Sequence, residues 1–259
     1  MPRRWTKSEE RLRRKELKKL YIENNMSIGE IAKIMSLGQS TVYDRLLRLD
    51  ITPIRSKKLR FNNKRNDISI PKDYSEKLSE FIGIMLGDGH LTPTQVTVTL
   101  GNKEESYVRY VTRLINKLFN IEPKVITRKG GYHIVYFGST VVVRWLLSMG
   151  LVFNKVKNQV NVPSWVFANN DYIKGFLKGF FDTDGSIYKL KFGVQLAFTN
   201  RSLPILGSLH RCLSLLGYNP SNISQFRTYL TKKKDVISFF KTVNPANAKH
   251  QKRFQMLLS

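Results

Sequence analysis

The sequence has little cysteine, few acidic residues and no long hydrophobic run. Cys212 is the single cysteine among 259 residues, which excludes an internal disulfide framework and a multi-cysteine zinc site. The most apolar stretches, 81–86 and 141–147, are too short to span a bilayer. No apolar segment follows the N-terminal Met-Pro-Arg-Arg-Trp, so no signal peptide is predicted. These absences favour an intracellular protein of the cytoplasm or nucleoid, and they leave an organellar host open.

The shortage of acids leaves a strongly basic chain. Lys and Arg number 44 against 19 Asp and Glu, so the net charge is +25. Such an excess indicates a polyanionic partner, and double-stranded DNA is the first candidate. An anionic membrane surface is disfavoured by the lack of apolar segments.

Residues 1–55 have the pattern of a small all-α helix-turn-helix domain. Ser27 and Glu30 have capping-box spacing, which predicts a helix with an apolar stripe on one side. Gly38 is expected to end that helix, and Ser40 or Thr41 to cap a third helix. The side chains of the third helix predicted to enter a DNA groove are Gln39, Ser40, Thr41, Tyr43 and Arg45. A three-helix bundle that binds protein is the alternative.

Residues 56–73 are predicted to form a basic linker. The segment 55–72 carries seven Lys and Arg against one Asp, and it shows no apolar period. A solvated tether and an extended arm along DNA phosphates both fit this composition.

From Tyr74 onward the sequence repeats, with copies at 74–153 and 170–259 joined by a linker at 154–169. Asp88 matches Asp184 at an offset of 96, and Asn102 matches Asn200 at an offset of 98. Each Asn precedes a predicted helix, at 103–118 and 201–216, and either the Asn or the next residue is placed to cap it. Alternation at 95–100 and 194–199 predicts strands, and Gly130-Gly131 predicts a hairpin. The fold class is therefore α+β, with two pseudo-symmetric αββαββα repeats.

The opening segments of the two copies carry a family resemblance. Phe81-Ile-Gly-Ile-Met-Leu-Gly-Asp-Gly89 and Leu177-Lys-Gly-Phe-Phe-Asp-Thr-Asp-Gly185 resemble the two motifs of single-chain LAGLIDADG homing endonucleases. The first motif departs at its sixth position, where Leu86 replaces the usual acid. The resemblance covers about 74–259. It implies a DNA-binding saddle of two sheets and a staggered double-strand cut with short 3′ overhangs.

Small residues in both motifs predict close packing of two helices. Gly83 matches Gly179, and a missing Cβ at both positions lets the backbones approach. Asp88 and Asp184 would then meet at the helix ends, where two carboxylates repel unless divalent cations lie between them. Mg²⁺, or Mn²⁺, suits such oxygen ligands and can support phosphodiester hydrolysis. The predicted metal set is Asp88, Asp184, Gly87 and Thr183.

A lysine near each acid would stabilise charge on the reacting phosphate. The family usually carries one after the last helix of each copy, and alignment of the two copies points to Lys155 and Lys249. Lys157 and Lys252 are nearby alternatives. The predicted catalytic set is Asp88, Asp184, Lys155 and Lys249.

The polar faces of the predicted sheets supply candidates for DNA contact in the major groove. They are Gln95, Thr97, Thr99, Arg128, Lys129, Lys189, Lys191, Gln195, Gln225, Arg227 and Thr228.

Together these features predict a monomeric, Mg²⁺-dependent, site-specific DNA endonuclease of the homing type. Two fused copies supply both halves of the saddle, so a long asymmetric DNA site is expected. A non-cleaving DNA-binding regulator is the main alternative, and the retained Asp88 and Asp184 argue against it. An intron RNA maturase is a third reading, with intron RNA as a further partner.

Overall fold

A computed structural model describes residues 6–24, 26–49, 51 and 68–258 of the chain. The chain divides into two units, Met1–Arg60 and Phe61–Ser259, and each has its own hydrophobic core. Most of the predicted linker, residues 56–67, lies outside the described residues. Among the helices described, none combines the length and apolar character needed to cross a bilayer.

The first unit is helical. Its elements are α1 (Lys7–Lys18), the π-helical turn η1 (Lys19–Glu23), α2 (Ile28–Ile34) and α3 (Gln39–Arg48). Ser27 caps α2, and the predicted capping box with Glu30 is present. The buried side chains of this unit are Leu17, Ile31, Ala32, Val42, Leu46, Leu49 and Ile51. Apolar spacing along α2 and α3 therefore predicted the face that packs.

Two details of the turn between α2 and α3 differ from the prediction. The helix ends at Ile34, and Ser36 rather than Gly38 takes the left-handed conformation, with φ of 51°. The third helix begins at Gln39, so Ser40 and Thr41 lie within its first turn and not at its cap. The predicted cap at Ser40 or Thr41 was wrong because the helix starts earlier than the apolar residues that marked it.

The second unit begins with an αββαββα segment, as predicted. Its elements are α4 (Glu76–Leu86), β1 (Gly89–Leu91), β2 (Gln95–Leu100), α5 (Glu105–Phe119), β3 (Lys124–Thr127), β4 (His133–Gly138) and α6 (Thr140–Ser148). The four strands form an antiparallel sheet in the order β1-β2-β4-β3. The glycines at 130 and 131 lie in the β3–β4 connection, where Gly131 has φ of 80°.

The following half lacks one expected strand. Its elements are η2 (Ser164–Ala168), α7 (Asn170–Asp184), β5 (Gly185–Leu190), β6 (Gly193–Thr199), α8 (Leu203–Leu215), β7 (Arg227–Leu230), α9 (Lys233–Thr242) and α10 (Ala248–Leu258). Its sheet has the order β5-β6-β7, all antiparallel. Where a hairpin was predicted, only an isolated bridge joins Ser224 to Arg227, and Gln225 and Phe226 both have positive φ. The segment before this turn therefore adds no further strand beside β7, which pairs with β6.

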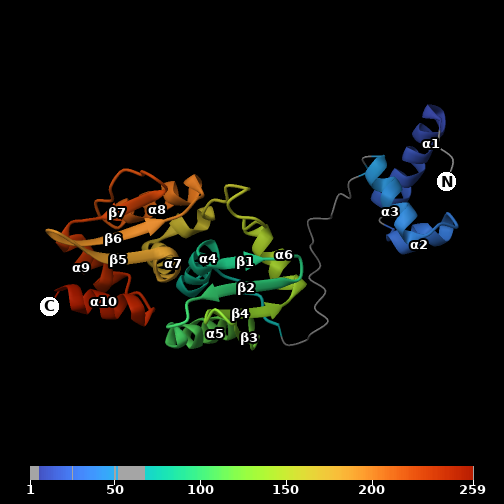
Figure 1. The fold of residues 1–259 in the computed structure, drawn as a ribbon. Helices are drawn as coiled ribbons and strands as arrows, with labels where there is room; N and C mark the ends of the chain where they lie inside the picture. The colour runs from blue at the N-terminus through green and yellow to red at the C-terminus, as the bar shows by residue number, and fades with distance from the viewer. Residues whose placement is uncertain (1–5, 25, 50, 52–67, 259) are drawn as a thin grey trace. The chain divides into compact units, whose positions relative to one another are not determined.

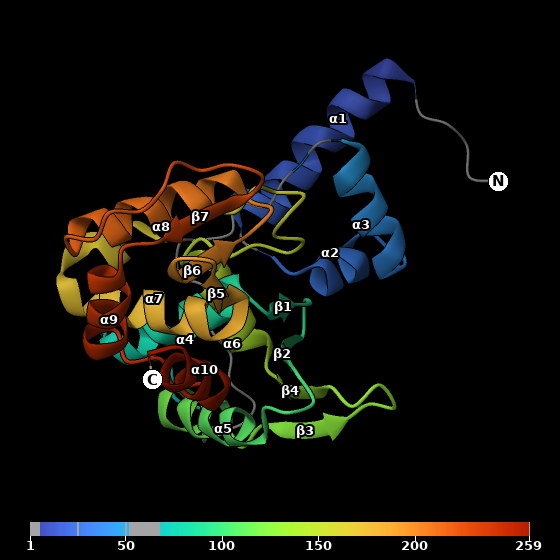
Figure 2. The same ribbon diagram turned by 60° about the vertical axis from the view of Figure 1, so that its left-hand side comes forward.

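The helices α4 and α7 lie side by side with the two sheets to either side of them (Figures 1 and 2). Ile82, Phe176, Leu177 and Phe180 are fully buried in the core that these helices share. Residues 68–70, predicted as part of the linker, join this core: Ile68 and Ile70 pack against it, and the Ser69 amide donates to the Phe119 carbonyl at 2.9 Å. The linker prediction was therefore too long at this end.

Candidate functional site

The site is built on the close contact of α4 with α7. A Cβ atom on Gly83 would stand 2.7 Å from the Phe180 backbone nitrogen, closer than real Cβ atoms come. On Gly179 it would overlap the Glu80 carbonyl oxygen. Gly175, which sequence reasoning passed over, meets the Glu76 carbonyl in the same way. The glycines thus let the two helix backbones touch, and the contact fixes where both helices end.

Asp88 and Asp184 come together at these ends. Asp184 is the last residue of α7, and Asp88 follows Gly87, the C-cap of α4. A Cβ atom on Gly87 would stand 3.6 Å from the Asp184 carboxyl carbon, so the Asp184 side chain lies directly against the end of α4. Burial, with the nearby Asp184 carboxylate, raises the pKa of Asp88 to about 7. Burial also raises the pKa of Asp184, against the opposing effects of Asn200 and Lys155.

Asn200 orients one of the two acids. Its Nδ2 donates to Asp184 Oδ2 at 2.9 Å, and its Oδ1 accepts from the Ser202 amide at 2.8 Å. Sequence reasoning saw Asn200 only as a helix cap, but α8 has Ser202 at its N-cap. Asn102 is likewise no cap, since Glu104 occupies that position before α5. The recurrence of an Asn after the motif Asp in both copies was the sequence signal that could have predicted the contact of Asn200 with Asp184.

Lys155 reaches the acid pair from the segment after α6. Its Nζ donates to the Met85 carbonyl at 3.0 Å and the Leu86 carbonyl at 3.1 Å, and it also contacts the Gly87 carbonyl. These carbonyls are free because they end the helix, and a cation there is favourable. Burial lowers the pKa of Lys155, whereas Asp184 and Asp88 favour its charged form. Its neighbouring alternative, Lys157, is exposed.

Lys249 has a different environment from its predicted counterpart. Its Nζ donates to Glu104 Oε1 at 2.6 Å, and Glu104 is only 7% exposed. The same carboxylate accepts from the Asn247 side chain at 2.9 Å and from the Gly101 amide at 2.5 Å. Both Glu104 and Lys249 act electrostatically on Asp88, with opposite signs. The two lysines are therefore not equivalent, because Lys249 is committed to a carboxylate. The other alternative, Lys252, is exposed.

Asp182, the acid at the sixth position of the second motif, has a structural environment. It is 1% exposed and accepts from the backbone amides of Ala246 at 2.8 Å and Asn247 at 3.0 Å. Burial raises its pKa to about 7, although these hydrogen bonds oppose the shift. It thereby ties the segment before α10 to α7. At the matching position Leu86 is fully buried without such a partner, so the two halves differ here.

The predicted metal ligands Gly87 and Thr183 touch each other. A Cβ on Gly87 would stand 2.9 Å from Thr183 Cβ, and Thr183 Oγ1 donates to the Gly179 and Phe180 carbonyls at 3.0 Å each. The described part of the chain holds no group of three His, Cys, Asp or Glu side chains suited to a metal. The site itself offers two carboxylates, those of Asp88 and Asp184. Mg²⁺ is commonly held by one or two carboxylates together with substrate phosphates.

The predicted DNA-contacting residues lie partly on the open faces of the two sheets and partly in turns. Pairing of Thr97 with Tyr136 sets Gln95, Thr97 and Thr99 on the face opposite the buried Val96 and Val98. Pairing of Tyr188 with Gln195 gives an equivalent open face on the other sheet, where Arg227 pairs with Thr199. Arg128, Lys129, Lys191 and Gln225 are exposed in turns.

Two of these candidates need correction. Thr228 is fully buried and donates to the Ser221 carbonyl, so its side chain cannot contact DNA. Lys189 pairs with Val194 and lies on the face of Ile187, where it lines a hollow with Arg253 and Met256. Sequence reasoning also missed Tyr188 and Tyr229 on the open face, although alternation with buried neighbours marked both.

In the first unit, the side chains predicted to enter a DNA groove lie along α3. Gln39, Ser40, Thr41 and Tyr43 are exposed, and Arg45 is half-buried. The helix therefore presents a polar surface opposite Val42, Leu46 and Leu49.

Two family models match the second unit. Residues 78–156 match the WhiA LAGLIDADG-like domain, and residues 171–255 match the LAGLIDADG-like domain. Among curated relatives, the glutamine–fructose-6-phosphate aminotransferase of Methanocaldococcus jannaschii is 30% identical over 124 residues, 47% of this chain and 11% of that protein. The replication factor C small subunit of the same organism is 31% identical over 119 residues, 45% of this chain and 6% of that protein. The chain thus spans only a small part of either relative.

More distant relatives carry the WhiA name. The probable cell division protein WhiA of Thermoanaerobacter sp. is 20% identical over 178 residues, 64% of this chain and 56% of that protein. Among solved structures, the N-terminal LAGLIDADG domain of DUF199/WhiA has a TM-score of 0.48 at 16% identity, over 65% of this chain and 80% of that one. I-DmoI in complex with DNA and Ca has a TM-score of 0.48 at 18% identity, over 65% and 88%. Two segments of this chain, residues 78–156 and 171–255, are thus each similar to a LAGLIDADG-like domain.

Proposed function

We propose that this chain is a divalent-metal-dependent DNA endonuclease of the homing type that cuts both strands of a long asymmetric site. The observation that carries the proposal is the pairing of Asp88 and Asp184 at the touching ends of α4 and α7. Burying two carboxylates so close together is costly, and the raised pKa of Asp88 expresses that cost. A chain that needed only a DNA-binding surface would gain nothing from it.

The residues of the site fit a hard divalent cation such as Mg²⁺. Asp88 and Asp184 would hold it, because Lys249 is paired with Glu104, so the charge of Lys155 is left to compensate two carboxylates. When bound, such an ion lowers the pKa of water and stabilises charge on a phosphate. The reaction adds water oxygen to phosphorus and breaks one P–O bond in each strand. Gly87 and Thr183 complete the proposed ligand set.

The chain's own residues supply position and charge. Asn200 fixes the orientation of the Asp184 carboxylate. Lys155 holds a positive charge beside both acids and would stabilise negative charge on a phosphate brought there. Lys249, which is held by Glu104, would act on the same site electrostatically. The open faces of the sheets, α3 and the charge of +25 would bind the duplex around the cut.

The relatives add a second line of support. The matched segments occupy 11% and 6% of two proteins whose names denote unrelated activities. This pattern is expected of a module carried by different proteins, as a homing nuclease would be. A non-cleaving regulator is the second candidate, and it is favoured by the WhiA match over 78–156 and by Leu86 in place of an acid.

Cleavage of a pool of randomised duplex DNA in Mg²⁺ tests the proposal. Asp88→Asn and Asp184→Asn should bind DNA like the parent chain but make no double-strand breaks, since losing ~4 kcal/mol of transition-state stabilisation slows a reaction about a thousandfold. Asp171→Asn is the matched control, because Asp171 is exposed at the other end of α7 and pairs with Lys174. DNA binding by the parent without any Mg²⁺-dependent cleavage would favour the regulator instead.

A further inference from the structure

A cavity of about 400 Å³ lies at the end of α4 remote from the acid pair. It is lined by Tyr74 and Leu78 at the start of α4, by Trp145 and Met149 of the α6 region, and by Trp165 of η2. An 11-residue helix is about 16 Å long, so the cavity is separate from Asp88 and Asp184. Its volume is within the roughly 300–1,000 Å³ typical of ligand pockets.

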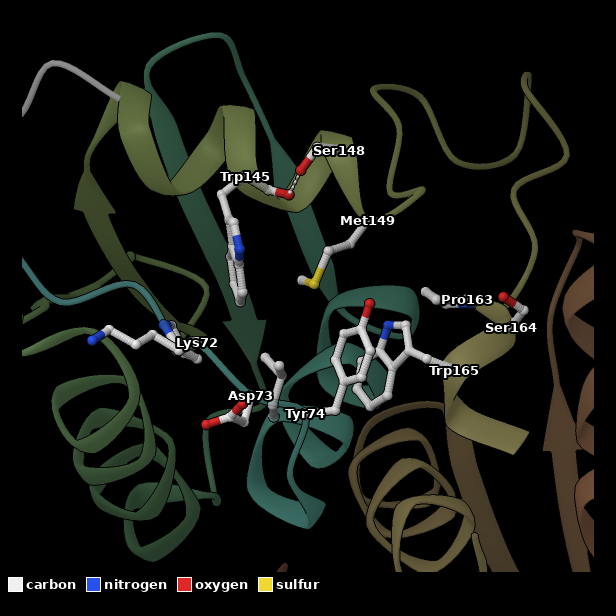
Figure 3. A pocket seen from close by; sticks show the side chains of 11 residues that line it. Lys72, Asp73, Tyr74, Trp145, Ser148, Met149, Pro163, Ser164 and Trp165 are labelled. Atoms are coloured by element: carbon white, nitrogen blue, oxygen red, sulfur yellow. Dashed lines mark hydrogen bonds between the residues drawn. The ribbon is translucent and has the colours of Figure 1, made fainter. Parts of the chain in front are cut away.

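The cavity has aromatic walls held in fixed positions. Tyr74 stacks on Trp165 with ring centroids 4.3 Å apart and planes 2° apart, and the Tyr74 carbonyl accepts from Tyr172 Oη at 2.9 Å. Trp145 is held edge-on against Phe119 at 5.8 Å. Figure 3 shows Trp145 and Tyr74 on opposite sides of the cavity, with Met149 reaching between them. Tyr74 is still 50% exposed, so the face that does not stack on Trp165 is open to a ligand.

Polar groups accompany the rings. Lys72 and Asp73 are exposed and line the cavity mouth, where Figure 3 places both below Trp145. The indole Nε1 of Trp165 is buried and has no hydrogen-bond partner among the described residues. A planar ring with hydrogen-bonding edges would use both the walls and these groups.

A second, basic hollow of about 200 Å³ also borders the first turn of α4. It is lined by Lys77 of α4 and by Tyr110, Arg113 and Lys117 of α5. Contact with Lys117, together with burial, lowers the pKa of Lys77 against the opposing effects of Glu80 and Glu76, so at least two cations lie close together here. Cations at the same end of α4 as an aromatic cavity suit a chain of phosphates that carries bases.

We propose that the aromatic cavity binds an unpaired base of single-stranded nucleic acid, with the adjoining phosphates on Lys77, Arg113 and Lys117. Bases in a duplex are stacked and paired, so only a single strand can place one in a cavity lined by Tyr74, Trp145 and Trp165. The site requires neither Asp88 nor Asp184, and its existence does not depend on cleavage.

Binding of a fluorescein-labelled 12-nucleotide single strand to the full chain tests the proposal. Tyr74→Leu should weaken binding about tenfold, whereas Tyr74→Phe, which keeps the ring, should bind like the parent. Duplex binding should be unchanged in both variants. An abasic strand of the same length should bind the parent about as weakly as the normal strand binds Tyr74→Leu.

Tryptophan fluorescence gives an independent readout. Two of the three tryptophans line the cavity, and Trp5→Phe removes the third. In that background the strand should quench the fluorescence, and adenosine monophosphate at the same base concentration should not. Unchanged strand binding by Tyr74→Leu, equal loss of duplex binding, equal binding of the abasic strand, or equal quenching by the mononucleotide would each overturn the proposal.

Discussion

Gly179 of α7 lies against Glu80 of α4 so closely that a Cβ atom would stand 2.9 Å from the Glu80 carbonyl carbon. The Glu80 side chain meets α7 again, through a 3.3 Å ion pair with Lys178 that Tyr110 supports with a 2.6 Å hydrogen bond. A backbone contact and a buried ion pair thus both join α4 to α7. The position of Asp88 and Asp184 depends on this packing of the two helices.

Gly179→Ala should therefore destabilise the second unit by several kcal/mol, since overpacking a rigid contact typically costs 1–3 kcal/mol or more. Urea unfolding measures it. Gly207→Ala is the matched control, because Gly207 is exposed within α8 and a Cβ there meets nothing within 4 Å. That change should stabilise by up to about 1 kcal/mol. Equal effects of the two substitutions would mean that the contact of α4 with α7 is looser than described.

Stability should depend on pH through Asp88. Its pKa is about 7 in the folded chain, against ~3.9 for an unfolded Asp. Between about pH 4 and 7 the folded state keeps a proton that the unfolded state has released, so the free energy of unfolding falls as pH rises. Asn at position 88 does not titrate, so Asp88→Asn does not lose this stability as pH rises. From about pH 4 to 7, its free energy of unfolding should therefore rise relative to that of the parent by up to a few kcal/mol.

Urea unfolding at pH 4.5, 6 and 7.5 in EDTA measures the difference. Asp182 has a similarly raised pKa but is present in both chains, so its contribution largely cancels. Asp171→Asn, at an exposed position at the other end of α7, is the control variant. A difference for Asp88→Asn that is flat or shrinks with rising pH would contradict the assigned burial.

Substitution of Lys155 and substitution of Lys249 should have different effects. Lys155→Met removes the ammonium beside both acids, so DNA cleavage should fall by tenfold or more while DNA binding changes little. Lys249→Met leaves Glu104 without its cation, so it should lower stability by about 1–3 kcal/mol before any effect on cleavage. Cleavage rates and urea midpoints of the two variants separate these outcomes. Lys157→Met and Lys252→Met, at exposed positions, serve as controls. If Lys155→Met and Lys249→Met changed the cleavage rate and the urea midpoint equally, the two lysines would not differ in role as described.

Removing residues 1–60 should leave the second unit folded, since the two cores share no residue. DNA binding should weaken, and the dependence of affinity on salt should become shallower because fewer phosphates are neutralised. Fluorescence anisotropy from 50 to 300 mM salt checks this. An unchanged salt slope would mean that the exposed residues of α3 do not contact DNA.

Short-range features were the most predictable from sequence. The capping box at Ser27 and the alternation in β2 depend on residues a few positions apart, and both are confirmed. The juxtaposition of Asp88 and Asp184 was also accessible, because the repeated Gly and Asp positions encode a helix pair. The lost strand before β7 was not, because a shortened hairpin leaves no apolar period to read.

Long-range polar contacts were beyond prediction. Glu104 and Lys249 are separated by 145 positions, and neither residue type nor spacing links them. Asp182 resembles a catalytic acid by its place in the motif, and only its contacts with Ala246 and Asn247 reveal a structural environment. Residues that bind each other across the chain leave no local pattern.

The Asp182 contacts also impose an order on the folding of the chain during its synthesis. Asn247 lies 65 positions after Asp182 and 143 after Glu104, and it hydrogen-bonds to both. While the ribosome is still making α8 and α9, α7 already carries an acid that has no partner in its own vicinity. Burying that acid unpaired is unfavourable. The tight docking of α7 on α4 should therefore be completed only after residue 247 has emerged. The central helix pair then forms late in synthesis, and its formation depends on the C-terminal segment.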